Sequence, residues 1–353
     1  DRPMATGIRD KVALLGMGCS RFGERWSANA EDLMLEAFCE GATQWVPLEQ
    51  LQAAAGRRIA ELTGTEAGLV TAGSAASLTL GTAAILCGYD LGRIERLPHC
   101  DDFPCEFVIA REQRSGYDHA VRAAGARFVE VGFNEIVSNA GVRRTEAWEY
   151  EAAFNENTAG VFYGYGHDSQ PPLAEVIERA HRHGLPVLVD AAGELPPKRN
   201  LTEITALGAD LVGFSGGKAI RGPQSTGILC GRRDLVASAA IQMLDMDDHL
   251  QLWDPPPELV DRDKLDGLPR HGIGRALKVS KEEVLALVTA LAMFSNLVIA
   301  GISGVLVPLG FRAIRIDPAL SSAVAVTTFT DVIGLLVYLG LAASMIGLIT
   351  GSL

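Results

Sequence analysis

The sequence predicts an α/β domain, with a mostly parallel sheet and helices on both of its faces, followed by an apolar helical hairpin. Between about residues 40 and 294, short apolar runs alternate with amphipathic ones, which is the pattern of repeated βαβ units. The second observation concerns charge, because no Asp, Glu, Lys or Arg occurs from Val284 to Phe311 or from Val332 to Leu353. The clearest predicted strands are residues 67–71, 159–163, 186–190 and 210–214.

Three stretches of different character divide the chain into residues 1–39, 40–294 and 295–353. The first opens with an apolar run at residues 12–15 and a turn containing Gly16 and Gly18. A dinucleotide-binding turn would need a third glycine where Arg21 stands, so that motif fails. The opening instead resembles the first strand and turn of thiolase-like proteins, as far as Phe38. Because the thiolase cysteine and histidine motifs have no counterpart, we expect no acyl transfer.

The middle stretch reads as an ordinary large α/β domain. One of its amphipathic segments, Leu173 to His183, places four apolar residues on one face and predicts a helix. The acidic segment from Asp245 to Asp266 contains three consecutive prolines and predicts a long surface loop.

Composition limits the classes of partner. The chain has 353 residues and a formal net charge of −12, so it repels phosphate backbones and we expect no nucleic-acid partner. Its six cysteines form no CxxC pair, which favours reduced thiols and a cytoplasmic location for the middle domain. A small molecule held by a few local cations is the expected ligand.

Two polar residues follow neighbouring predicted strands. Asp190 ends the strand 186–190, and the carboxyl ends of parallel strands are where open α/β sheets bind ligands. Lys218 follows the next strand through Ser215 and two glycines, which let the backbone approach a flat ring closely. A carboxylate facing a pyridine nitrogen and a lysine amine are two requirements of pyridoxal phosphate (PLP) chemistry. Taken singly, Asp190 could be a turn residue and Lys218 a solvated surface residue.

A glycine-rich turn precedes both residues and predicts the third requirement, a phosphate cradle. Gly73, Ser74, Ala75 and Ser77 lie between the strand 67–71 and a helix, whose first N–H groups suit an anion. Such turns are common, and this one is informative because it precedes Asp190 and Lys218 along the chain. The fourth requirement is a flat group on the ring, for which His119 and Tyr117 are the candidates; either could also be a surface aromatic.

Taken together, these residues resemble the selenocysteine synthase-like branch of fold-type-I PLP enzymes, which includes L-seryl-tRNA(Sec) selenium transferase and D-glucosaminate-6-phosphate ammonia-lyase-like proteins. The resemblance covers about residues 40–294, and its most specific segment is the run from Asp210 to Leu229. Supporting segments are Trp45 to Glu49, Tyr117 to Gly125 and Gly272 to Glu283.

The resemblance implies the role of each site residue. Lys218 would be the Schiff-base lysine and Asp190 the pyridine partner, and Arg275 and Lys278 would bind the substrate's anionic group. From the residues alone, Arg275 and Lys278 could equally be solvated charges at a helix start. The cofactor set implied in full is Asp190, Gly73, Ser74, Ala75, Ser77, Ser215, Lys218 and His119, and the substrate set is Arg275, Lys278 and Gln224.

An activity and an assembly follow from the same resemblance. It implies a homodimer that removes the α-proton of a small amino acid or amino sugar acid and carries out β-elimination or replacement, as a lyase or a transferase. The tRNA-binding module of the selenium transferases has no counterpart at the N-terminus, which again favours a small molecule. Family members also carry a C-terminal small domain, and the sequence after residue 294 does not resemble it.

The apolar tail predicts a different location for residues 295–353. Two uncharged runs of spanning length, separated by a short charged turn, predict a transmembrane hairpin, although a pair of buried core helices has the same pattern. The tail resembles the last two membrane helices of MgtE-type magnesium transporters, and that resemblance implies Asp331 as a metal ligand. An acid within an apolar segment indicates function in its own right.

These likenesses follow one another along the chain almost without overlap. We therefore hypothesise a chimera, a junction of three unrelated gene pieces. The main functional prediction is a PLP enzyme; the alternatives are a membrane magnesium-transporter fragment and a chimeric chain without an intact activity.

Overall fold

The computed structural model describes residues 45–133, 143–244 and 249–294, together with Leu35, Phe38, Cys39, Ala42 and Thr43. The chain divides into two compact units, Pro47–Val284 and a second made of Asp1–Val46 with Leu285–Leu353. Only the first unit is described nearly throughout, and the architecture below is that of Pro47–Val284.

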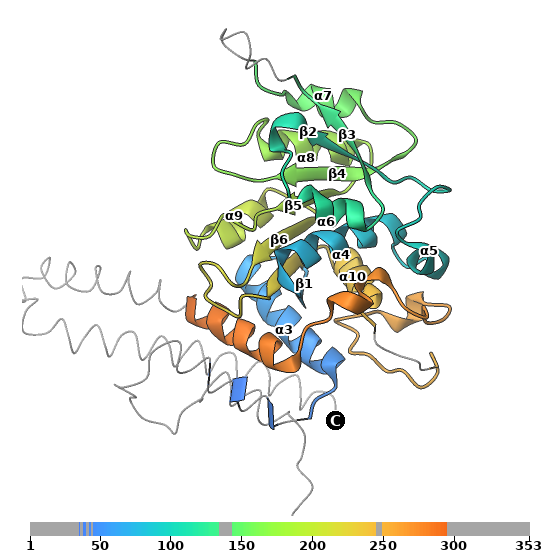
Figure 1. Ribbon diagram of the computed structural model, residues 1–353, viewed down its shortest axis with the longest axis vertical. Coiled ribbons are helices and arrows are strands. Elements are labelled where there is room, and N and C mark those ends of the chain that lie inside the picture. Colours follow the sequence, from blue (N-terminus) through green and yellow to red (C-terminus); the bar gives the residue numbers. More distant parts are fainter. Residues whose placement is uncertain are drawn as a thin grey trace, which may run out of the picture. The chain divides into compact units, whose positions relative to one another are not determined.

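A seven-stranded sheet forms the centre of this unit (Figure 1). Its strand order is β1-β7-β6-β5-β4-β2-β3, and every strand except β7 runs in the same direction. The carboxyl ends of six strands therefore share one edge of the sheet, at which β7 begins. The strands are β1 (Ala67–Thr71), β2 (Glu106–Ala110), β3 (Arg127–Val131), β4 (Thr158–Gly164), β5 (Val187–Asp190), β6 (Leu211–Ser215) and β7 (Gly227–Gly231).

Helices cover both faces of the sheet. On β1, Gly68 faces Ile59 of α3, whereas the neighbouring Leu69 points into the cluster that α4 and α10 share. The α-helices are α3 (Leu48–Thr63), α4 (Gly73–Cys87), α5 (Leu91–Arg96), α6 (Asp118–Ala123), α7 (Ala147–Ala152), α8 (Leu173–Arg182), α9 (Asn200–Ala206) and α10 (Arg233–Gln242). Short 3₁₀ helices are η1 (Arg111–Gln113), η3 (Arg262–Lys264) and η4 (Ile273–Leu277).

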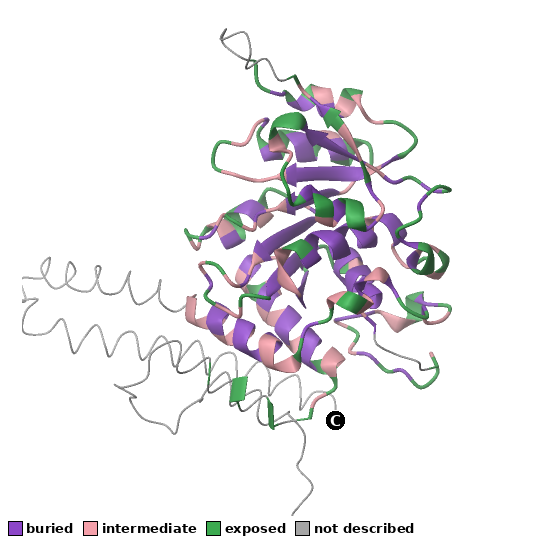
Figure 2. Cartoon of the chain, in the orientation of Figure 1, coloured by how far each residue is buried: buried purple, intermediate pink, exposed green. Residues whose placement is uncertain are grey.

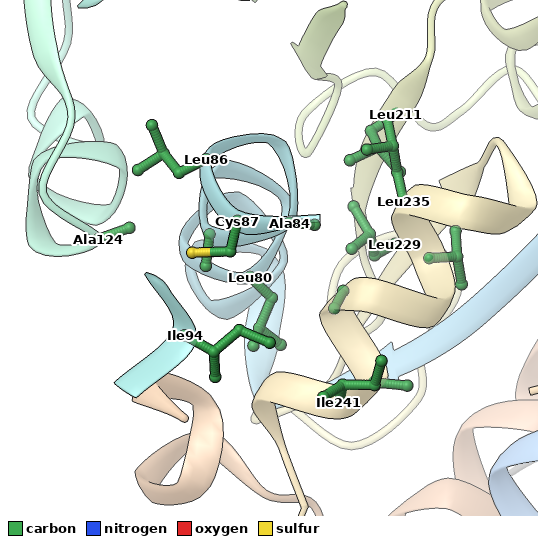
Figure 3. Close-up of a cluster of buried hydrophobic side chains, with 14 of the residues drawn as sticks. Leu80, Ala84, Leu86, Cys87, Ile94, Ala124, Leu211, Leu229, Leu235 and Ile241 are labelled. Carbon is green, nitrogen blue, oxygen red and sulfur yellow. The ribbon is translucent and has the colours of Figure 1, made fainter. Parts of the chain in front are cut away.

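The largest apolar cluster lies between the sheet, α4 and α10. Because α4 is apolar on nearly all sides, it is buried from Ala76 to Ala84, between the strands and α10 (Figure 2). Its Leu80 and Ala84 lie near Leu211 and Leu229 of the sheet and Ile241 of α10 (Figure 3). The central strands β5, β6 and β7 are buried along almost their whole length, as parallel strands covered on both faces must be.

The predicted α/β architecture is confirmed. The four strands expected from the sequence correspond to β1, β4, β5 and β6, and the expected helix from Leu173 is α8, with Leu173, Val176, Ile177 and Ala180 buried. The segment after residue 248 differs from the expected surface loop. It lacks long regular elements, but Trp253, Leu259 and Val260 are buried in the main cluster, because apolar residues within the acidic stretch anchor it.

Several predictions fall on residues that the structure does not describe. The tail 295–353 with Asp331, and all but three residues of the thiolase-like stretch 1–39, lie outside the described residues. Within the described residues, no helix is both long enough and apolar enough to cross a membrane. The five cysteines in the described part of the chain are free thiols.

Candidate active site

The predicted site residues meet at the carboxyl edge of the sheet. Asp190 ends β5 and pairs with Gly164 of β4 on one side and Gly213 of β6 on the other. The loop carrying Lys218 leaves β6 at this edge and returns as β7, and the turn into α4 leaves β1 there. Three segments that are separate in the sequence are thus brought to one edge.

Asp190 is a carboxyl group that the protein has partly removed from water. Burial raises its pKa above the ordinary value, while the Ala192 N–H and the positive charge of Lys218 act in the opposite direction. Its Oδ1 accepts a hydrogen bond from Ala192 N at 3.0 Å. A desolvated carboxylate close to a lysine is suited to hold a cationic group, because such a partner relieves the cost of its own charge.

The Lys218 loop is a closed turn. Gly216 N donates to Thr226 O at 2.9 Å, and Gly222 N donates back to Gly216 O at 2.9 Å. Gly217 packs so closely on the opposite limb that an added Cβ would lie 2.6 Å from Gln224 Cα, which explains glycine there. The turn leaves Lys218 and Gln224 exposed and Ser215 half-buried, so all three remain accessible at the edge.

The glycine turn into α4 is shaped for close backbone contact. Gly73 has φ +86°, and a Cβ on Gly227 would lie 2.3 Å from Gly73 C, so two glycines allow β7 and this turn to touch. No side chain caps the helix, and its first turn contains no acidic residue. Its free N–H groups and the positive end of its dipole are therefore available to an anion.

The members of this turn differ in exposure. Ala75 is exposed and Ser74 is half-buried, whereas Ser77 is fully buried, with its Oγ 2.7 Å from Thr71 Oγ1. The accessible part of the predicted phosphate cradle is thus Gly73 to Ala75. Ser77 holds the turn onto the end of β1, and its predicted cofactor contact stays a prediction.

The candidates for the flat group lie on α6 and just before it. His119 is exposed, with its Nδ1 3.4 Å from an Arg122 guanidinium nitrogen, and Tyr117 is exposed as well. The helix packs on α4, where Thr79 Oγ1 donates to Ala120 O at 2.9 Å. His119 is therefore carried on a helix beside the glycine turn, and its stacking role stays a prediction.

The segment with Arg275 and Lys278 lies over α4 and α10. Gly274 packs against Leu80, where an added Cβ would be 2.5 Å from Leu80 Cδ2, and Ile273 N donates to Gln242 Oε1 at 3.2 Å. The following residues turn toward the lysine loop, since Ser225 Oγ is hydrogen-bonded to Glu283. The structure thus brings this segment to the α/β domain, and the substrate roles of Arg275 and Lys278 stay predictions.

Sequence reasoning missed two residues at the same edge. Gln113 joins the ends of β2 and β4, because its Oε1 accepts from Gly164 N at 3.2 Å and its Nε2 donates to Gln170 O at 3.0 Å. Asp118 is buried at the start of α6, and its charge acts on Asp190. The structure pairs it with Arg114, which lies before the helix, so the spacing of the two residues gave no helical signal in the sequence.

The chain is similar to known proteins along the same stretch. Residues 136–245 match the family model of class-V aminotransferases. A 5'-C-glycyluridine monooxygenase-decarboxylase from Streptomyces sp is 34% identical over 75% of this chain and 59% of its own length. D-glucosaminate-6-phosphate ammonia lyase from Salmonella typhimurium is 27% identical over 73% of this chain and 61% of its own length.

A solved structure shows the same likeness in three dimensions. A D-glucosaminate-6-phosphate ammonia-lyase superposes with a TM-score of 0.60 at 26% identity, covering 74% of this chain and 62% of that one. The domain has the fold-type-I architecture of PLP enzymes. An L-seryl-tRNA(Sec) selenium transferase from Desulfovibrio desulfuricans, 34% identical over 32% of this chain and 25% of its own, supports the selenocysteine synthase-like likeness.

The chain corresponds to part of each relative's length. The chain spans about 60% of the length of the first two. A second family model, the divalent cation transporter MgtE, matches residues 271–341. The first residues of this match include η4, which the structure places in the α/β unit Pro47–Val284. The class-V aminotransferase match and the start of the MgtE match therefore lie in the same folded unit.

Proposed function

We propose that this domain is a PLP-dependent enzyme that removes the α-proton of a small amino acid or amino sugar acid and carries out β-elimination or replacement. One observation carries the proposal: Asp190, Lys218 and the uncapped glycine turn of α4 meet at one sheet edge. The relatives support PLP as the cofactor, since class-V aminotransferases, ammonia lyases and selenium transferases depend on it.

The residues present fit that cofactor. Gly227 lets β7 touch the backbone of the turn at Gly73, which holds the turn in place at the sheet edge, and the turn offers backbone N–H groups to a phosphate. Asp190 suits a protonated ring nitrogen, because its carboxylate is desolvated and gains from a cationic partner. Lys218 is close enough for its charge to act on Asp190, as an amine serving the same ring must be.

Each residue then has a distinct task. When bound, PLP supplies an electron sink that weakens the bonds at the α-carbon of an amine substrate. Asp190 keeps a proton at the ring nitrogen, and the Lys218 amine takes the proton from the substrate's α-carbon. In elimination the bond from the β-carbon to its leaving group breaks and Lys218 passes the proton to that group; in replacement a nucleophile takes the leaving group's place and Lys218 returns the proton to the α-carbon. Arg275 and Lys278 bind the substrate's anionic group, and His119 covers the ring.

The substrate class follows the relatives' names. D-glucosaminate 6-phosphate and 5'-C-glycyluridine are both small, hydroxylated molecules, and we infer a substrate of that kind in preference to tRNA. The net charge of −12 supports the same choice, because an acidic chain repels a polynucleotide. We also infer a homodimer, which light scattering of the purified chain would test.

A spectrum of the full chain with added PLP tests the proposal. We expect a visible absorption band in the wild-type chain and in Lys264→Ala, which changes an exposed lysine, and loss of the band in Lys218→Ala. Release of ammonia from D-glucosaminate 6-phosphate would then test elimination. A folded wild-type chain that gives no band with PLP contradicts the proposal.

A second candidate function rests on the match of residues 271–341 to MgtE. Under it, residues 295–353 form a membrane hairpin and Asp331 contacts a magnesium ion. Fractionation of cells expressing the full chain tests it. Recovery in the membrane fraction, with magnesium uptake that Asp331→Asn abolishes, is expected; recovery without detergent in the soluble fraction contradicts it.

A further inference from the structure

Asp118 stands out among the buried acids. In the described ranges, Asp118 and Asp210 are the two carboxylates that are buried, with 2% and 4% exposure. Both oxygens of Asp210 have hydrogen-bond partners, whereas Asp118 Oδ1 has none. A buried charged oxygen without a donor is costly, so it needs an explanation.

The other half of the Asp118 carboxylate is firmly held. Its Oδ2 accepts from Arg114 Nε and from Ser115 N, the latter at 3.2 Å. Arg114 also pairs with Glu130, which in turn pairs with Arg111 at 3.0 Å. This network fixes the carboxylate in one orientation and balances its charge, yet it leaves Oδ1 without a partner.

The position of Asp118 connects it with the candidate active site. It follows β2, whose carboxyl end lies at the site edge, and it begins α6, which Thr79 ties to α4. The negative charge of Asp118 also contributes to the raised pKa of Asp190, which places the two acids within electrostatic reach. Asp118, with its unpartnered oxygen, therefore lies in the neighbourhood in which the ligand is proposed to bind.

We propose that Asp118 is a specificity-determining residue of this site, whose Oδ1 accepts a hydrogen bond from a hydroxyl group of the substrate. The inference rests on the proposed function and deepens it. A carboxylate only accepts hydrogen bonds, so its missing partner is a donor, and a phosphate or carboxylate group would be repelled. Asp118 thus selects hydroxyl-bearing amino acids, while the substrate's anionic group binds elsewhere.

The variant Asp118→Asn replaces the acceptor Oδ1 by an NH₂ donor and leaves the other oxygen an acceptor. A guanidinium only donates, so Arg114 keeps the amide's carbonyl oxygen and the amide NH₂ takes the place of Oδ1. A substrate hydroxyl that donated to Oδ1 then faces a donor. Asp118→Ala removes the acceptor without adding a donor, and Glu130→Gln is the matched control because it changes the same Arg114 network elsewhere.

The experiment uses the full chain loaded with PLP and follows changes in the visible spectrum during titration. The probes are D-glucosaminate, which bears hydroxyls, and D-norleucine, which has the same six-carbon chain without them. We expect the wild type and Glu130→Gln to prefer D-glucosaminate. Asp118→Asn should weaken D-glucosaminate binding by about 10-fold or more, Asp118→Ala should weaken it less, and D-norleucine binding should not change.

The outcomes separate this inference from the proposed function. A PLP band in all variants with an unchanged preference for D-glucosaminate overturns the role of Asp118 alone. So does equal weakening of both probes, or weakening by Glu130→Gln as well, because each indicates a structural role. Absence of the band in the folded wild type overturns the proposed function and this inference with it.

Discussion

Asp190 and Asp210 are two aspartates at opposite edges of one sheet, and the protein treats them differently. Asp210, just before β6, lies at the amino edge, where Oδ2 accepts from His181 Nε2 and Val187 N at 2.8 Å and Oδ1 accepts from Arg232 at 2.8 Å. Asp190 ends β5 at the carboxyl edge, where its Oδ1 accepts from Ala192 N, the donor that the described residues provide, and burial raises its pKa.

The different hydrogen bonding of the two aspartates indicates a structural role for Asp210 and a ligand-binding role for Asp190. The partners of Asp210 join α8, β5 and the end of β7, so its carboxylate stabilises the fold, and both of its oxygens are already hydrogen-bonded to the protein. Asp190 is largely removed from water, and its side chain has fewer hydrogen bonds to described residues than that of Asp210. Burying a carboxylate in this way destabilises the folded chain, and such groups are typical of sites where a ligand supplies the missing interaction. Substitutions at the two positions should therefore affect different properties, activity at Asp190 and stability at Asp210.

The largest expected effect is on catalysis by Asp190→Asn. An amide cannot stabilise a proton on the ring nitrogen, so kcat/KM should fall by at least about 100-fold while the fold persists. Steady-state kinetics with circular dichroism measures both. Asp266→Asn, an exposed acid near η3, is the control and should keep full activity.

The next effect is on stability and belongs to Asp210. Asp210→Ala leaves Arg232 and Val187 N without their partner and should lower the free energy of unfolding by about 3–5 kcal/mol. Asp234→Ala removes the other, half-exposed partner of Arg232 and should cost at most about 1 kcal/mol. Urea unfolding measures both; equal losses would contradict the assigned role of Asp210.

A smaller effect concerns pH in the cofactor-free chain. Because the pKa of Asp190 is raised in the folded state, the folded chain binds more protons than the unfolded one between pH 3.8 and that raised pKa. The contribution of Asp190 to stability is therefore greatest below this window and decreases as pH rises through it, by at most about 1.4 kcal/mol for each pH unit that the window spans. Relative to wild type, Asp190→Asn should gain stability across the window, as urea unfolding at a series of pH values would measure. A constant difference would contradict the assigned burial effect.

The last comparison concerns two glycines with positive φ. Gly73 has φ +86° and Gly64 has φ +69°, and an added Cβ at either position would meet no atom within 3.4 Å. Alanine at either position should cost about 1–2 kcal/mol through backbone strain. Only Gly73→Ala should also weaken PLP binding severalfold, as measured by absorbance titration. Equal PLP affinities would argue against the turn as the phosphate cradle.

Much of the domain could be predicted from the sequence because its signals are local. The strands ending at Asp190 and Ser215 are continuous apolar runs, and the glycines around Lys218 indicate a close turn. Gln113 was missed because its role depends on a contact across the sheet, with Gly164. Asp118 was missed because its burial and its unpartnered oxygen depend on how α6 packs in the folded domain. The burial of Trp253 within an acidic stretch could not be predicted either, because the residues of the apolar cluster that it joins are distant in sequence.

Lys218 is the lysine proposed to bond to the cofactor. The direct measurement is to incubate the full chain with PLP, reduce it with borohydride, digest it and locate the phosphopyridoxyl group by mass spectrometry. We predict a single modified peptide that carries the group on Lys218. Modification of a different lysine, such as Lys198 or Lys278, with Lys218 unmodified would contradict the account.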